Sequence, residues 1–105
     1  MQELIGDLTA VGQTVLAAFR PVLPLHQIIL FGGQARFRAY VFYVTQRDVE
    51  RLSGTQAEES LRAAIRRELQ ATGSGRSDGL DLSFVFDSYE SVKQRFNGSY
   101  DRYFR

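Results

Sequence analysis

The chain has 105 residues, of which 44% are hydrophobic and 24% are charged. This composition is that of a folded globular domain and excludes an intrinsically disordered chain, and the length predicts a single domain over residues 1–105 rather than two independent cores. Thirteen basic and twelve acidic residues leave a formal charge of +1, so no global electrostatic field would draw the protein onto nucleic acid or an anionic membrane.

The first half of the chain predicts a helix followed by a β-hairpin. Apolar residues recur every three or four positions over residues 4–19, which is the spacing of one helical face, and Pro21 would end that helix. Residues 27–31 form a short run of β-formers, and the pair Gly32-Gly33 is typical of a tight hairpin turn. We expect a second, antiparallel strand over residues 35–44.

Alternation along this second strand sorts its side chains onto two faces. One face, expected to meet the helix, carries Phe37, Ala39, Val41 and Tyr43. The other face carries Arg36, Arg38, Tyr40 and Phe42. Arg and Tyr are frequent at the hot spots of protein interfaces, so these four residues are candidates for contact with a partner.

The second half of the chain predicts another helix and another strand. After a polar stretch at residues 47–54, Thr55 and Glu58 have the spacing of a capping box, which places the start of a helix there. A loop rich in glycine and serine follows at residues 72–79. Residues 80–87 then alternate between apolar and polar side chains, as a strand with one buried face does.

The tail from Ser88 to Arg105 admits two interpretations. Asp87 and Glu90 could cap a short helix, whereas Asn97-Gly98 also fits a hairpin turn. We favour a short helix, a turn and an ordered end. The tail carries four aromatic residues, namely Phe96, Tyr100, Tyr103 and Phe104. They would pack against the core or, if exposed, mark an interface, so Tyr100 and Tyr103 join the partner-binding candidates.

Together these elements predict an α+β fold. We expect a small antiparallel sheet of three to four strands with two main helices packed on one face. The expected order is α-β-β-α-β, followed by α or β.

Sequence patterns nominate no catalytic, metal or cofactor site. The chain has no Cys, and its single His, His26, has no patterned nucleophile or acid beside it. Gly32-Gly33 runs into a strand rather than a helix, unlike a phosphate-binding loop. Four acidic residues near the third strand lack the spacing of a calcium loop, namely Asp78, Asp81, Asp87 and Glu90. We therefore expect a non-enzymatic protein without cofactor or metal.

The first residues of the chain resemble neither a signal peptide nor a membrane span, which predicts a cytoplasmic protein without membrane contact. Three alternatives to binding another protein stay open. The first is binding of nucleic acid through Arg36, Arg38 and the nearby aromatics, which the near-zero charge disfavours. The second is an enzyme or ligand binder whose acids and single His converge only in three dimensions. The third is a homodimer formed by pairing exposed strand edges.

The segment HQIILFGGQARFRAYVFYV, which follows the proline-marked turn, resembles the hairpin of the YezG-like bacterial immunity proteins. A weaker match continues through the second helix and the strand LDLSFVFDSYESV. The positions that match the hairpin pattern are Phe31, Tyr40, Phe42 and Tyr43. The resemblance implies tight stoichiometric binding to a toxin encoded nearby, with no cofactor and no turnover.

Overall fold

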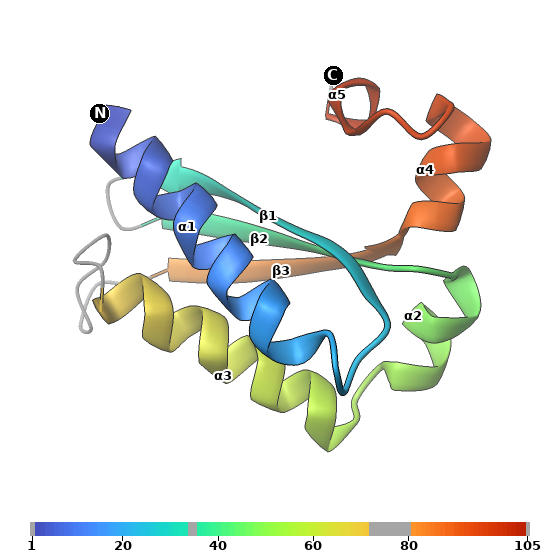
Figure 1. Cartoon of the computed structure of the whole chain (residues 1–105), viewed down its shortest axis with the longest axis horizontal. Helices are drawn as coiled ribbons and strands as arrows, with labels where there is room; N and C mark the ends of the chain where they lie inside the picture. The colour runs from blue at the N-terminus through green and yellow to red at the C-terminus, as the bar shows by residue number, and fades with distance from the viewer. Residues whose placement is uncertain (1, 34–35, 72–80, 105) are drawn as a thin grey trace.

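The computed structural model describes residues 2–33, 36–71 and 81–104. Its elements are α1 (Gln2–Phe19), β1 (Leu25–Gly33), β2 (Arg36–Tyr43), α2 (Gln46–Leu52), α3 (Gln56–Ala71), β3 (Asp81–Ser88), α4 (Tyr89–Phe96) and α5 (Tyr100–Tyr103). This arrangement confirms the predicted α+β class and the predicted order of its main helices and strands (Figure 1).

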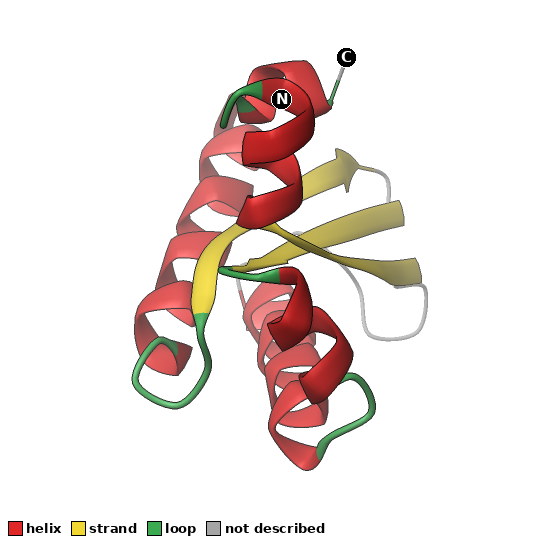
Figure 2. Ribbon diagram, turned by 90° about the vertical axis from the view of Figure 1, so that its right-hand side faces the viewer, coloured by secondary structure: helices red, strands yellow, loops and turns green. Residues whose placement is uncertain are grey.

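The three strands form one mixed sheet in the order β1-β2-β3. β1 pairs with β2 antiparallel, as the hairpin pattern predicts, whereas β2 and β3 are parallel from the pair Arg36 and Asp81 to the pair Tyr43 and Ser88. The prediction of an antiparallel sheet is therefore wrong for β3. The chain leaves the end of β2 and returns through α2 and α3 to the opposite end of the sheet, so β3 runs in the same direction as β2. Figure 2 shows the three strands fanning out, as expected of a twisted sheet.

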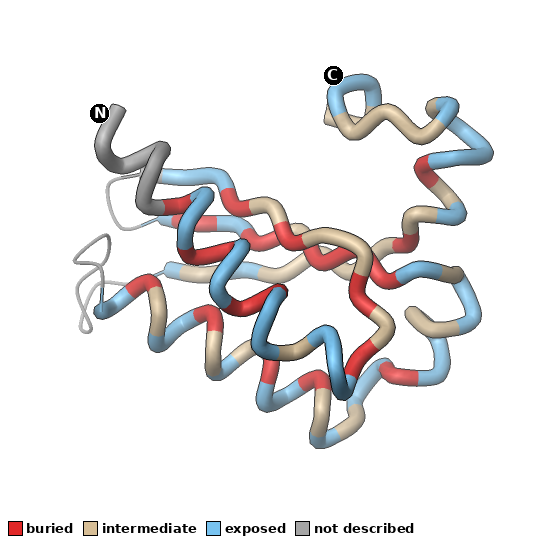
Figure 3. Tube along the Cα trace, in the orientation of Figure 1, coloured by how far each residue is buried: buried red, intermediate tan, exposed pale blue. Residues whose placement is uncertain are grey.

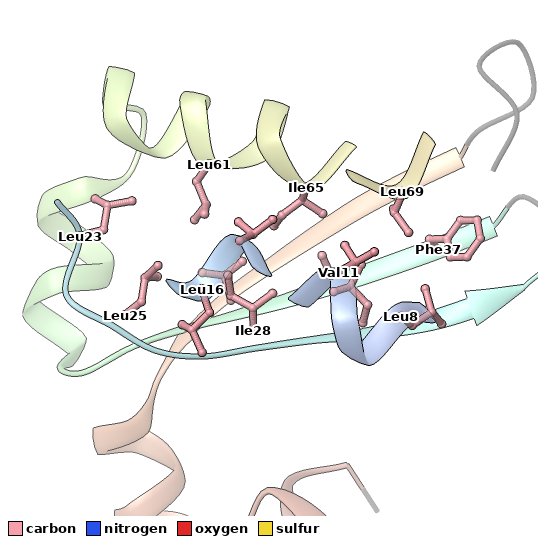
Figure 4. Close-up of a cluster of buried hydrophobic side chains, with 14 of the residues drawn as sticks. Leu8, Val11, Leu16, Leu23, Leu25, Ile28, Phe37, Leu61, Ile65 and Leu69 are labelled. Carbon is pink, nitrogen blue, oxygen red and sulfur yellow. The ribbon is translucent and has the colours of Figure 1, made fainter. Parts of the chain in front are cut away.

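α1 and α3 lie side by side across one face of the sheet and enclose the main hydrophobic core (Figure 1). The predicted inner face of β2 is confirmed, because Phe37, Ala39, Val41 and Tyr43 are all buried. Buried positions recur along the sides of α1 and α3 that face the strands (Figure 3). The residues that meet between the helices and the sheet include Leu8, Val11 and Leu16 of α1, Ile28 of β1, and Leu61, Ile65 and Leu69 of α3 (Figure 4).

Gly32 and Gly33 lie in β1 and not in the turn that the sequence predicts for them. Gly32 pairs with Phe37 and Gly33 pairs with Arg36. The φ angle of Gly32 is +146°, and an added Cβ would collide with the carbonyl oxygen of Arg36. Glycine is therefore needed here for close approach of two backbones. The connection at residues 34–35 lies outside the described residues.

The polar stretch predicted at residues 47–54 overlaps most of the helix α2 (Gln46–Leu52). Thr45 begins it, because the Thr45 hydroxyl accepts a hydrogen bond from the Asp48 N–H at 3.1 Å, and the Asp48 carboxylate accepts one from the Thr45 N–H at 3.3 Å. This reciprocal cap uses Asp where the usual pattern has Glu or Gln, so the sequence pattern does not reveal it.

α3 begins where Thr55 predicts, although only half of the predicted capping box forms. The Thr55 hydroxyl accepts from the Glu58 N–H at 3.3 Å. The Glu58 carboxylate turns away and accepts from the Gly54 N–H at 3.1 Å and from the Tyr43 hydroxyl at 3.0 Å. The loop predicted at residues 72–79 and the first residue of the predicted strand, Leu80, lie outside the described part of the chain.

The tail forms a short helix, a turn and an ordered end, which confirms the favoured interpretation. Ser88 caps α4 by accepting from the Ser91 N–H at 3.0 Å. Asn97 ends α4 in the left-handed conformation with a φ of 54°, and the Gly98 N–H donates to the Val92 carbonyl at 3.1 Å. Asn97-Gly98 thus terminates a helix instead of forming the alternative hairpin.

Candidate functional site

The sheet face opposite α1 and α3 carries a second hydrophobic cluster, which we call the tail cluster: Phe31, Tyr40, Phe42, Phe96, Tyr100, Tyr103 and Phe104. Its centre is Phe42, which is 0% exposed. The rings of Tyr100 and Tyr103 pack against Phe42 at centroid distances of 4.7 and 5.2 Å. The aromatic residues of the tail therefore pack in the fold, on the outer face of β2 rather than in the main core.

Polar groups at the rim of the tail cluster attach the tail to the sheet. The Tyr103 hydroxyl donates to the Asp87 carboxylate of β3 at 2.8 Å. The Tyr100 hydroxyl and His26 Nδ1 of β1 share a hydrogen bond of 2.6 Å, and the His26 ring stacks on Tyr89 at 3.9 Å. Burial raises the pKa of Tyr100, and burial together with the bond to Asp87 raises the pKa of Tyr103, so both phenols keep their protons further into the alkaline range than an exposed Tyr does.

The structure separates the predicted partner-binding residues into covered and uncovered ones. Phe42 is fully buried beneath the tail, so its side chain is inaccessible to a partner in this conformation. Tyr40, Tyr100 and Tyr103 are half-buried. Arg36 and Arg38 are exposed. The tail thus covers one end of the predicted surface and leaves its basic end open.

The uncovered end forms a hollow of about 520 Å³, which we call the open-face groove. All three strands and the end of the tail contribute to it. Its principal lining residues are Phe31 of β1, Arg36, Arg38 and Tyr40 of β2, Asp81 of β3, and Phe104. Strand register explains this convergence, because Phe31 pairs with Arg38 and Arg36 pairs with Asp81.

The open-face groove has an excess of positive charge. Arg36 Nε lies 3.9 Å from the Asp81 carboxylate, but the two side chains are 86% and 70% exposed, so solvent weakens this ion pair. Arg38 makes no ion pair with any residue that the structure describes. Phe31 is 46% exposed beside these cations. The groove can therefore offer guanidinium groups to an anion and an aromatic ring to an apolar group.

The predicted acidic residues near β3 do not come together. Asp81 lines the open-face groove, Asp87 bonds to Tyr103, and Glu90 accepts from the Gln46 N–H at 2.8 Å. Asp78 lies outside the described residues. Among the residues that the structure describes, no group of three or more acids or histidines could hold a metal ion. None of the described helices is long and apolar enough to span a membrane.

Sequence reasoning identified the cations of the groove and missed the contribution of two rings. The sequence pattern groups Phe104 with the packed aromatics of the tail, and Phe31 stands out only as a position that matches the hairpin resemblance. A register in which Gly33 pairs with Arg36 places Phe31 beside Arg38, but the sequence pattern assigns the turn to the two glycines. Phe104 had no such signal, because its position depends on how the tail folds back over the sheet.

A search of protein-family models, curated proteins and solved structures finds no significant match to this chain. The resemblance to the YezG-like hairpin therefore stays a prediction.

Proposed function

We propose that this chain acts by binding another protein without turnover, and that the open-face groove receives an acidic segment of that partner. The observation that carries the proposal is the pair Arg36 and Arg38, two exposed guanidinium groups on the uncovered half of a face whose other half is packed. Among the described residues, Asp81 is the carboxylate that lines the groove with them, and its exposed ion pair with Arg36 is too weak to neutralise both cations.

The chemistry of the groove supports a partner segment with carboxylates next to an apolar side chain. A guanidinium group matches a carboxylate in a bidentate geometry, and Arg pays less rotamer entropy per hydrogen bond than Lys. Phe31 and Phe104, whose rings meet at 4.9 Å, supply an apolar wall beside the cations. Aromatic and Arg side chains in one hollow are the composition of an interface hot spot.

The same residue types also occur in platforms for single-stranded nucleic acid, which stack bases on open ring faces. Here the ring of Tyr40 is enclosed by edge contacts from Phe31, Tyr103 and Phe104. Of the groove-lining rings Phe31, Tyr40 and Phe104, Phe31 is exposed and the other two are half-buried. The geometry therefore favours a protein partner over a strand of bases.

As the finer part of this proposal, the partner is a bacterial toxin that the chain inhibits stoichiometrically in the cytoplasm. Support for this part comes from the resemblance of the hairpin to the YezG-like immunity proteins. The retention of Phe31 and Tyr40 at matching positions in the groove is consistent with it.

The test compares three tagged proteins expressed in the native host: the wild type, R36E/R38E, and the control R47E/K93E. Arg47 and Lys93 are exposed and lie outside the groove. Both double variants replace two basic residues with Glu, so they change the net charge equally. We expect the wild type and the control to retain one protein near equal stoichiometry. Calorimetry with that purified protein should show that R36E/R38E binds at least about tenfold more weakly.

Recovery of nucleic acid in place of protein would overturn the proposal. Equal affinity of R36E/R38E and R47E/K93E would overturn the assignment of the groove. A partner that is not a toxin would support the proposed protein binding but would overturn the proposed inhibition of a toxin.

A further inference from the structure

The outer edge of the sheet at β3 has the properties of a docking strand. β3 pairs with β2 on one side only. In the described parts of the chain, no backbone hydrogen bond joins residues 81–87 to any element other than β2. An edge strand in this state presents a row of N–H and C=O groups that can pair with another extended chain.

β3 also lacks the features that usually block such pairing. It contains no Pro, Lys or Arg, and its register with β2 is regular over all eight residues. Its two charged residues, Asp81 and Asp87, lie on the sheet face away from α3, where Asp81 lines the open-face groove and Asp87 bonds to Tyr103. The other edge strand, β1, is different: it has a bulge between Leu25 and Gln27, and α1 lies so close that a Cβ on Gly12 would come within 2.8 Å of the Ile28 carbonyl oxygen. Within the described residues, β3 is therefore the edge that is open to a further strand.

A basic groove runs beside this edge, between α3 and β3. It has a volume of about 520 Å³ and is lined by Glu59, Arg62, Arg66, Arg67, Leu82 and Phe84, among others. Arg62 is held in place, because its guanidinium lies 4.9 Å above the Phe86 ring and 3.8 Å from the Glu58 carboxylate. Arg66 and Arg67 are exposed and make no ion pair with a described residue.

We infer that the free edge of β3 accepts an extended acidic segment of a partner protein as a fourth strand, with its carboxylates directed at Arg66 and Arg67. Arg66 and Arg67 are consecutive residues of α3 and both line this groove, so the pair forms one cationic position beside the edge. Side chains on one face of an added strand recur about every 6.8 Å, which would bring a carboxylate opposite that position. Every second side chain of the added strand would face the arginines of α3. This site lies on the sheet face opposite to the open-face groove and does not depend on the proposed function.

The probe is a peptide in which Glu alternates with Val, long enough to pair with all of β3 and carrying one terminal Trp. Because the chain itself has no Trp, peptide fluorescence reports binding without background. We expect salt-sensitive binding, slower exchange of the β3 amide hydrogens, and no binding of the matching Lys-Val peptide. Binding to R66E/R67E should be at least about tenfold weaker, whereas the control R47E/K93E should bind as the wild type does.

R66A/R67A should also bind more weakly. Because Ala favours helix, this variant removes both guanidinium groups without the charge reversal that could unfold α3. Absence of binding at low salt would overturn the inference. Binding that leaves β3 exchange unchanged, or equal weakening in R66E/R67E and R47E/K93E, would show nonspecific attraction. Light scattering that finds a dimer with β3 already protected would show that a second copy occupies the edge.

Discussion

His26 is held in the fold by three neighbours. Its ring stacks on Tyr89, its Nδ1 bonds to Tyr100, and Arg20 donates to its backbone carbonyl at 3.1 Å. Burial first, and the charge of Arg20 second, lower the pKa of His26 below its usual 6.5.

This pKa shift predicts that acid destabilises the protein through His26. Between the lowered pKa and 6.5 the unfolded chain binds more protons than the folded one, so stability falls as pH drops through this window. Because His26 is the only His in the chain, its imidazole resonance in NMR reports the folded pKa directly. Urea unfolding at about pH 7 and about pH 5 should show a smaller acid loss for His26→Gln than for the wild type. A midpoint at or above 6.5 would contradict the prediction.

Glu58 shows how a local motif can be correct in position and wrong in partner. Its N–H donates to the Thr55 hydroxyl as predicted. Its carboxylate, in a residue that is 3% exposed, instead accepts hydrogen bonds from the Tyr43 hydroxyl and the Gly54 N–H. Tyr43 is fully buried at the end of β2, and a buried hydroxyl without a partner is costly. Burial of Tyr43, which the strand pattern predicts, therefore determines the conformation of Glu58.

At the scale of elements, the packing of α1 against β1 depends on one small residue. Gly12 lies in the buried face of α1, where an added Cβ would come within 2.8 Å of the Ile28 carbonyl oxygen. Glycine in a helix interior costs about 1 kcal/mol relative to Ala. Close approach of the helix to the strand compensates for that cost.

Gly12→Ala should therefore lower the free energy of unfolding by about 1–3 kcal/mol, although Ala favours helix, because the helix must move away from β1. The neighbouring Gln13 is exposed, and Gln13→Ala should change stability by less than about 0.5 kcal/mol. Urea titration followed by circular dichroism measures both. A Gly12→Ala protein that is more stable than the wild type would show that the close contact does not form.

For the whole molecule, β2 is the element that both cores share. Its inner face packs under α1 and α3, and its outer face packs under the tail. A sheet with one solvent-exposed face would leave Phe42 in water, whereas here it is 0% exposed. The tail therefore contributes to the stability of the whole fold.

Phe42→Ala is expected to cost about 3–5 kcal/mol, the range for a large aromatic side chain removed from a core. Phe31→Ala provides the matched control on the same face, with a smaller loss because Phe31 is 46% exposed. Near- and far-ultraviolet circular dichroism should report coincident transitions, since one strand links both cores. A loss below about 1 kcal/mol for Phe42→Ala would mean that the tail does not cover it in solution.

The sequence alone determined most elements and the inner face of β2, because hydrophobic period, prolines and helix caps act between residues a few positions apart. It also identified Arg36 and Arg38 as candidates for contact with a partner. The tertiary structure decided the parallel direction of β3, the burial of Phe42, and the place of Phe31 and Phe104 in the open-face groove. These features depend on contacts between distant parts of the chain, such as Phe42 with Tyr100 and Arg36 with Asp81. No local pattern encodes such pairs, because their formation depends on how the packed elements fill space around one another.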